Sequence, residues 1–242
     1  MFKKNEIRDT EIVKAIDNGC TRKSLASIYG ITPVRVGEIY KKAKRHENIV
    51  KSCVAMKEME DLLGGEIQLT LPKEEGIFFD PEENGSTFVE NAIIKAKALY
   101  DVVQSPVLSD DSGLCVKALD WGPGIHTARF GDTEERKLDS REKYMLLLEK
   151  MEGVEDREAY FTCALCLYLS PTRIYVIQEE AKGKIALTPS TGKEGFGYDP
   201  VFFSDEAGQI VADLPLGEKG KYSHRGKAAR VMYELIKKEI EK

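Results

Sequence analysis

The segment LSDDSGL, Leu108–Leu114, sets two adjacent carboxylates at the end of an apolar run. The preceding residues are typical of a short buried strand, and successive strand side chains point to opposite faces. Asp110 and Asp111 can face the same way only if the strand ends there, and Ser112-Gly113 favours that ending. Carboxylates at the carboxyl end of a strand in an α/β sheet lie where ligands usually bind. The string therefore predicts a site for a hard cation such as Mg²⁺, although a solvated Asx-type turn would explain it equally well.

A helix is predicted upstream, in TFVENAIIKAKALY at Thr87–Tyr100. Thr87 is a suitable N-cap and Glu90 follows three residues later, which is the spacing of a capping box. The apolar residues that follow have helical period. A role in the helix cap is enough to explain a glutamate at position 90, but a carboxylate in the first turn of a helix can also face a metal. Asn91 beside it can hold a neighbouring loop by hydrogen bonds.

The segment GFGYDP, Gly195–Pro200, places Phe196 and Tyr198 next to Asp199. An aromatic face with an adjacent carboxylate can stack on a purine and accept a hydrogen bond from its ring N–H. A tight turn that enters a strand at residues 201–203 is the alternative interpretation.

The segment GEKGKYSHRGKAARVM brings four basic side chains, Lys219, Lys221, His224 and Arg225, to the start of an amphipathic helix. Ser223 is a suitable N-cap for that helix. On its own this is also an ordinary helix entry with solvated positive charge.

Together these four segments resemble the inosine triphosphate pyrophosphatase family, from about residue 49 to the C-terminus. WGPGIHTARFG at Trp121–Gly131 and FTCALCLY at Phe161–Tyr168 belong to the same resemblance. It implies an α/β fold with an elongated mixed sheet flanked by helices in two lobes. It also implies Mg²⁺-dependent hydrolysis of ITP, dITP and XTP to the monophosphate and pyrophosphate, by an enzyme that forms a homodimer.

The resemblance also implies roles for individual residues. Asp111 matches the catalytic carboxylate, which is also a metal ligand; Glu90 matches the other metal-binding acid, and Asp110 a supporting catalytic acid. Donors aimed at a 6-oxo group would be left unpaired by adenine, so the family's pocket disfavours ATP. The residues that match substrate contacts are Ser52, Lys57, Ser112, Phe196, Gly197, Tyr198, Asp199, Lys219, His224 and Arg225.

The chain departs from the family pattern in NIVKSCVAMKEMEDLL, where Val54 stands at the position of an asparagine. Valine has no side-chain hydrogen bond to offer, and losing one charge-assisted phosphate contact costs about 1.5–3 kcal/mol. This departure motivates an alternative function, a nucleotide-sensing DNA-binding regulator with a weakened or inactive pyrophosphatase body.

Residues 1–46 precede the predicted pyrophosphatase domain, which spans 47–242. The stretch RKSLASIYGITPVRVGEIYKKAKR has the offsets of a helix-turn-helix. Thr21 and Thr32 are suitable N-caps, Gly30 suits the turn, and Pro33 suits the first position of the second helix. Ala26 is small enough to let the two helices approach, and Val36 and Ile39 are predicted to fill the small core between them. DNA is therefore a predicted partner, contacted through Arg35, Lys41 and Lys42; a helical module used only for dimer contacts is the alternative.

The charge distribution fits this division. Residues 1–50 hold 11 Lys and Arg against 6 Asp and Glu, whereas the remaining residues hold 25 against 35. A basic arm on an acidic body is expected when only the arm meets nucleic acid.

Bulk composition favours a cytoplasmic protein. No apolar run approaches the roughly 18 residues of a membrane span, and the polar start MFKKNEIRD lacks a signal-peptide core. The 5 cysteines are an odd number and are expected to be reduced thiols. Cys163 and Cys166 form a CxxC on a predicted strand, where that spacing points them to opposite faces.

The remaining elements alternate between strands and helices. A helix is expected at about 133–151, followed by an antiparallel pair of long strands at 159–169 and 173–186.

Overall fold

The computed structural model describes residues 8, 11–12, 14–16, 18–44, 48–51, 68–192, 196–215 and 217–240. Its elements in chain order are α2 (Arg22–Tyr29), α3 (Pro33–Lys44), β1 (Asn48–Lys51), β2 (Gln68–Thr70), α5 (Phe88–Val103), β3 (Val107–Val116), η1 (Lys117–Leu119), η2 (Gly124–Arg129), α6 (Ser140–Lys150), β4 (Glu158–Ser170), β5 (Arg173–Ile185), η3 (Asp199–Val201), β6 (Phe202–Ser204), β7 (Gln209–Ile210), η4 (Val211–Asp213), α7 (Lys219–Tyr222) and α8 (His224–Ile240). No helix within these ranges is both long and apolar enough to span a bilayer.

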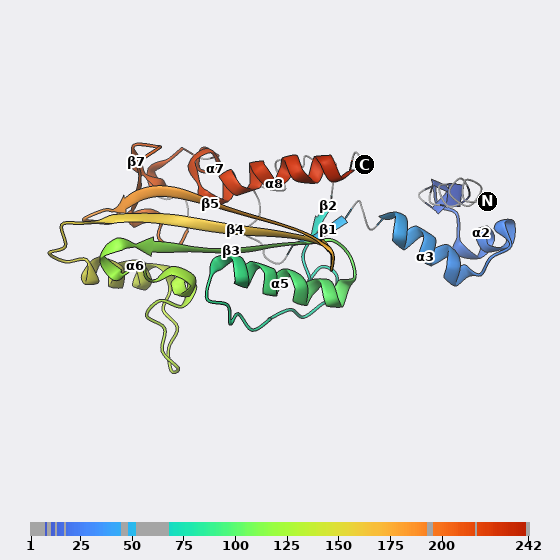
Figure 1. Cartoon of the computed structure of the whole chain (residues 1–242), viewed down its shortest axis with the longest axis horizontal. Coiled ribbons are helices and arrows are strands. Elements are labelled where there is room, and N and C mark those ends of the chain that lie inside the picture. Colours follow the sequence, from blue (N-terminus) through green and yellow to red (C-terminus); the bar gives the residue numbers. More distant parts are fainter. Residues whose placement is uncertain are drawn as a thin grey trace.

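The strands form one mixed sheet of seven strands in the order β2-β1-β3-β4-β5-β6-β7. β1 runs parallel to β2 and β3, and all the other neighbours are antiparallel. The long strands β3, β4 and β5 extend along the body, as Figure 1 shows. The predicted antiparallel pair and the mixed pairing are both confirmed.

Helices cover both faces of this sheet because the central strands are apolar on both sides. α5 packs on the face that carries Ala164 and Cys166, and α8 packs on the face that carries Cys163 and Leu165. The two cysteines of the CxxC therefore lie on opposite faces, as predicted. α6 lies at the opposite end of the long strands from α5 (Figure 1). It contributes Leu147 to another buried hydrophobic cluster.

The prediction that the strand ends at the two aspartates is wrong. β3 continues from Val107 to Val116, and its pairing with β4 is unbroken through Asp110↔Leu165 and Asp111↔Ala164. The long antiparallel partner overrides the local turn tendency of Ser112-Gly113. As a result the two aspartates point to opposite faces of the sheet.

The helix expected from residue 133 starts later, at Ser140. Asp139 accepts from the Glu142 amide at 2.8 Å, and Glu142 returns a bond to the Asp139 amide at 2.9 Å. This capping box fixes the helix start, whereas Thr133 accepts from the Arg136 amide in a separate turn.

Two helices, α2 and α3, lie in the N-terminal stretch for which a helix-turn-helix is predicted. Thr21 accepts from the Ser24 amide and Thr32 from the Arg35 amide, and Gly30 ends α2 with φ of 63°. Their shared core buries Ile12, Leu25, Ala26, Val36 and Ile39. Figure 1 places these helices beyond the β1 end of the sheet.

Candidate active site on both faces of strand β3

Asp110 points to the α8 face and is bound there by three side chains. Arg225 donates to it from Nε at 3.0 Å and from Nη2 at 3.4 Å. The Ser112 hydroxyl donates at 3.0 Å and the Cys163 thiol at 3.2 Å. Burial opposes ionisation of Asp110, but the charge and hydrogen bonds of Arg225 outweigh it and hold the pKa of this carboxyl below its ordinary value.

Asp111 points to the α5 face, where Lys95 donates to its Oδ1 at 2.6 Å. The same ammonium lies 3.5 Å from Oε2 of Glu83. Oδ2 of Asp111 is buried and has no hydrogen-bond partner among the described residues. Burial raises the pKa of Asp111 even though the Lys95 ammonium opposes the shift.

One edge of β3 connects the two faces. β1 pairs with β3 only at Val107 and Leu108, so in the described part of the chain the edge beyond Leu108 has no strand beside it until the single bridge at Cys115.

A cavity of about 490 Å³ opens on the α8 side, within the size range of small-molecule sites. Phe161 and the backbone of Gly113 contribute to its wall. A Cβ on Gly113 would come within 2.4 Å of the carbonyl oxygen of Gly124, so this position requires glycine. Eight of the predicted substrate-binding residues line this cavity: Ser112, Phe196, Gly197, Tyr198, Asp199, Lys219, His224 and Arg225.

The turn at residues 196–199 presents an aromatic face to the cavity. Phe196 is 62% exposed, and Lys219 Nζ lies 4.6 Å from its ring centroid. Oδ2 of the buried Asp199 accepts from the Phe196 amide at 2.8 Å and from Lys219 at 2.5 Å. Asp199 therefore fixes the turn and the lysine, a task that the sequence did not indicate.

His224 lines the cavity and stacks on Phe161, with ring centroids 4.9 Å apart and an interplanar angle of 9°. Burial lowers the pKa of His224 to about 3, aided by the charges of Arg225 and Lys219 and opposed by Asp110. The imidazole is therefore neutral at physiological pH.

This shift makes stability depend on pH. Between about 3 and 6.5 the unfolded chain binds a proton at His224 that the folded chain does not, so unfolding becomes easier as pH falls. The slope from this group is about 1.4 kcal/mol per pH unit. We expect His224→Phe, which keeps an aromatic ring there, to reduce the acid sensitivity of the free energy of unfolding, measured in urea between pH 4 and pH 6.

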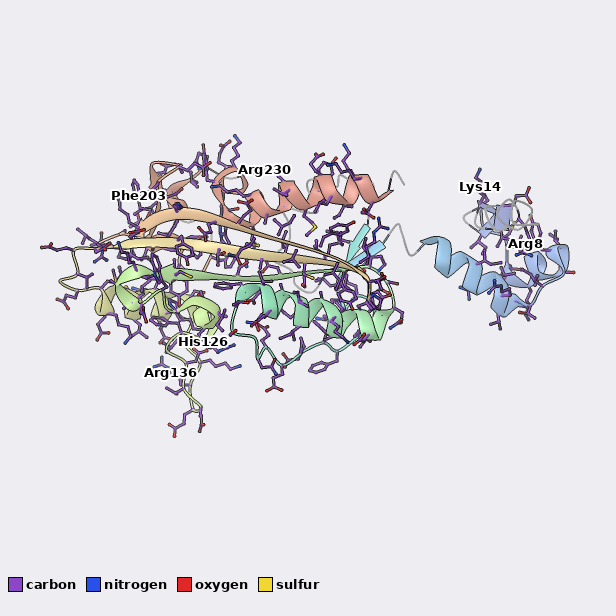
Figure 2. The ribbon with its side chains drawn as sticks, viewed as in Figure 1. Arg8, Lys14, His126, Arg136, Phe203 and Arg230 are labelled. Carbon is purple, nitrogen blue, oxygen red and sulfur yellow. The ribbon has the colours of Figure 1, made fainter. Side chains whose placement is uncertain are left out.

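The matched control is His126→Phe, because His126 is exposed on η2 (Figure 2). It should leave the slope unchanged. Identical slopes for the wild type and the His224 variant would contradict the assignment.

Glu90 lies in the first turn of α5, where its carboxylate is bound by the residue just before the helix cap. Its Oε2 accepts from the amide and the hydroxyl of Ser86, both at 2.7 Å, and these bonds, led by the one from the hydroxyl, lower the pKa of Glu90. Thr87 caps the helix as predicted. Oδ1 of Asn91 accepts a hydrogen bond from the Gly85 amide, which is the kind of loop contact predicted for Asn91. Lys95, on the same helix, donates to Asp111 Oδ1 at 2.6 Å.

Four functional candidates were missed from the sequence: Glu83, Lys95, Phe161 and Cys163. Lys95 lies four residues after Asn91 on a predicted helix, which places the two side chains on one face and was a usable signal. The other three depend on contacts between distant segments.

Ser52, Val54 and Lys57 lie outside the described residues. Among the described residues no group of three or more His, Cys, Asp and Glu side chains is arranged to hold a metal ion.

The comparisons with known proteins agree with this geometry. The model of the Ham1 family matches residues 42–235. A dITP/XTP pyrophosphatase of Treponema denticola is 47% identical over 181 residues, covering 75% of this chain and 92% of the relative. One from Leptospira interrogans is 38% identical over 172 residues, covering 71% and 85%. The structure of a HAM1 protein from Coxiella burnetii superposes with a TM-score of 0.72 at 34% identity, covering 79% of this chain and 98% of that one. The chain belongs to the Ham1 family.

Proposed function

We propose that the protein hydrolyses the non-canonical purine nucleoside triphosphates ITP, dITP and XTP to the monophosphate and pyrophosphate. Relatives named dITP/XTP pyrophosphatase support this reaction. The observation that carries it is the buried Asp111, whose Oδ2 lacks a partner among the described residues, near a cavity with an aromatic wall and three cationic side chains.

In this proposal one face of β3 recognises the nucleotide base and the other carries out the reaction. On the α8 side, Phe196 stacks on the purine, while Lys219, Arg225 and neutral His224 contact the nucleotide and donate to the 6-oxo group. Adenine offers an amino group at that position, so the same donors would lose their acceptor. On the α5 side, Asp111 accepts a proton from the attacking water, since its buried Oδ2 has no hydrogen-bond partner among the described residues.

A divalent cation fits the α5 side. Oδ2 of Asp111 is a buried acceptor without a partner among the described residues, and Glu83 adds a second carboxylate near Lys95. We propose Mg²⁺ as this cation, since it prefers oxygen ligands and shares its shell with phosphates. When bound, it neutralises phosphate oxygens and lowers the pKa of a coordinated water. Glu90 as a ligand stays a prediction, as do the homodimer and the cytoplasmic location.

The experiment that tests the function is incubation of the purified chain with Mg²⁺ and one of ITP, dITP, XTP, ATP or GTP. Release of pyrophosphate from the first three, with much slower release from ATP and GTP, is the expected result. Release of orthophosphate would contradict the reaction. Tight binding of ITP without any release would instead favour the sensor function, in which Val54 weakens the grip on the triphosphate.

A second function, binding of duplex DNA, is favoured by the N-terminal helices. α2 and α3 have no acidic residue in their first turns, which carry Arg22, Lys23 and Arg35. Val34, beside Arg35, is 72% exposed and available to a thymine methyl. Arg8 and Lys14 add positive charge to the same module (Figure 2). The side chains of Lys41 and Lys42 lie outside those described, so their predicted contacts stay predictions.

We expect the full chain to retard duplex DNA in a gel at 50 mM salt and to lose most of that binding at 200 mM. Lys23→Ala with Arg35→Ala should reduce the salt slope by about two, because each removes about one phosphate contact. Lys97→Ala, on the surface of α5, is the control and should change nothing. If the chain does not retard DNA at 50 mM salt, the DNA-binding proposal is wrong.

A further inference from the structure

The Asp110 carboxylate has its acceptor positions occupied by neighbouring side chains. It is 6% exposed and receives donors from three elements: Ser112 on its own strand, Cys163 on β4, and Arg225 on α8. This distinguishes it from Asp111, whose Oδ2 has no partner among the described residues. A carboxylate already engaged in this way is poorly placed to accept a proton from water or to ligate an ion.

Strand register brings the three donors together. Ser112 lies two residues after Asp110, so both side chains are on one face, and Cys163 is the cross-strand partner of Ser112. Arg225 descends onto the same face from the first turn of α8. The thiol and the hydroxyl hold the carboxylate in place, and the carboxylate then binds the guanidinium.

Binding by two of its nitrogens fixes the plane of the Arg225 guanidinium as well as its position. Arg225 also lines the cavity, with its Cζ 5.7 Å from the Phe196 ring centroid. The part of the guanidinium that faces a purine stacked on Phe196 is therefore held in one orientation.

We propose that Asp110 is a positioning residue for base selection, which orients Arg225 with the help of the Cys163 thiol, and is not a catalytic acid. This inference rests on the proposed function for its substrate and assigns the two adjacent aspartates separate tasks: Asp111 acts on the reaction and Asp110 on recognition of the base.

Asp110→Asn keeps the shape of the side chain and removes its charge. We expect KM for ITP to rise by about 10- to 100-fold, the range set by loss of one charge-assisted contact. The preference for ITP over ATP should fall, and kcat should stay within about threefold. A fall in kcat beyond 100-fold with KM unchanged would show a catalytic acid and overturn the proposal, and so would unchanged values of both.

Cys163 gives a milder test in case the aspartate variant does not fold. Cys163→Ala removes the donor and should raise KM by about three- to tenfold, whereas Cys163→Ser keeps a donor and should restore most of the affinity. Cys166→Ala is the matched control, since it makes the same change in the same strand on the opposite face. It should leave KM unchanged, and thermal unfolding of all variants separates folding from positioning.

Binding of inosine monophosphate, measured by calorimetry without turnover, separates this inference from the proposed function. If the wild type binds the monophosphate and Asp110→Asn weakens that binding by at least tenfold, the positioning role holds even for a chain that releases no pyrophosphate. Equal binding by both would overturn it.

Discussion

Replacing Asp111 by Asn is expected to lower kcat for ITP by about 10²- to 10⁴-fold, the range typical of a lost general base. Asparagine keeps the volume of the side chain and can still accept a hydrogen bond from Lys95, which donates to Oδ1 at 2.6 Å. It cannot accept the proton of the attacking water, and it binds a divalent cation more weakly. The measurement is pyrophosphate release at saturating ITP and Mg²⁺.

Binding of inosine monophosphate should change by less than tenfold in this variant, because the cavity lined by Phe196 and Arg225 lies on the other face of β3. Asp101→Asn is the control. Asp101 is an exposed partner of Lys97 on α5, and such surface pairs contribute little. If Asp111→Asn retains at least a tenth of the wild-type kcat, Asp111 is not the general base.

The sequence predicted features that depend on near neighbours. The caps at Thr21, Thr32 and Thr87 are determined within four residues of chain, and all three were correct. The opposite facing of Cys163 and Cys166 follows from strand period alone. The family resemblance carried by the order of the motifs, together with the alternation of strand and helix patterns, was enough to predict the mixed α/β fold.

The errors depend on pairing between distant segments. The pairing of β3 with β4, about fifty residues away, carries the strand through Asp110 and Asp111 where the local string favours a turn. That pairing turns the two aspartates to opposite faces of the sheet, whereas the sequence had predicted that they share one cation site. It also brings Cys163 to Asp110, a contact for which no motif exists. Lys95 was missed because its charge looked like an ordinary solvated helix position.

Gly226 offers a second large effect, and its direction opposes helix propensity. A Cβ there would lie 1.8 Å from the Gly220 carbonyl oxygen and 2.7 Å from its carbon. Alanine in a helix interior is normally favoured over glycine by about 1 kcal/mol. Here the clash is with backbone, which cannot rotate away, so α7 must move from α8. We expect Gly226→Ala to destabilise the fold by about 1–3 kcal/mol, the usual cost of overpacking, and to lower Tm by several degrees.

The same movement disturbs the nucleotide cavity, because α7 carries Lys219 and the first turn of α8 carries Arg225. KM for ITP should therefore rise at least about tenfold, the effect of one misplaced charged contact. Gly37→Ala is the matched control: its Cβ would meet only the movable end of Arg22, at 3.3 Å. The control should keep wild-type stability or gain from helix propensity. Equal Tm and KM for Gly226→Ala and the wild type would mean that α7 and α8 are packed less closely than this contact requires.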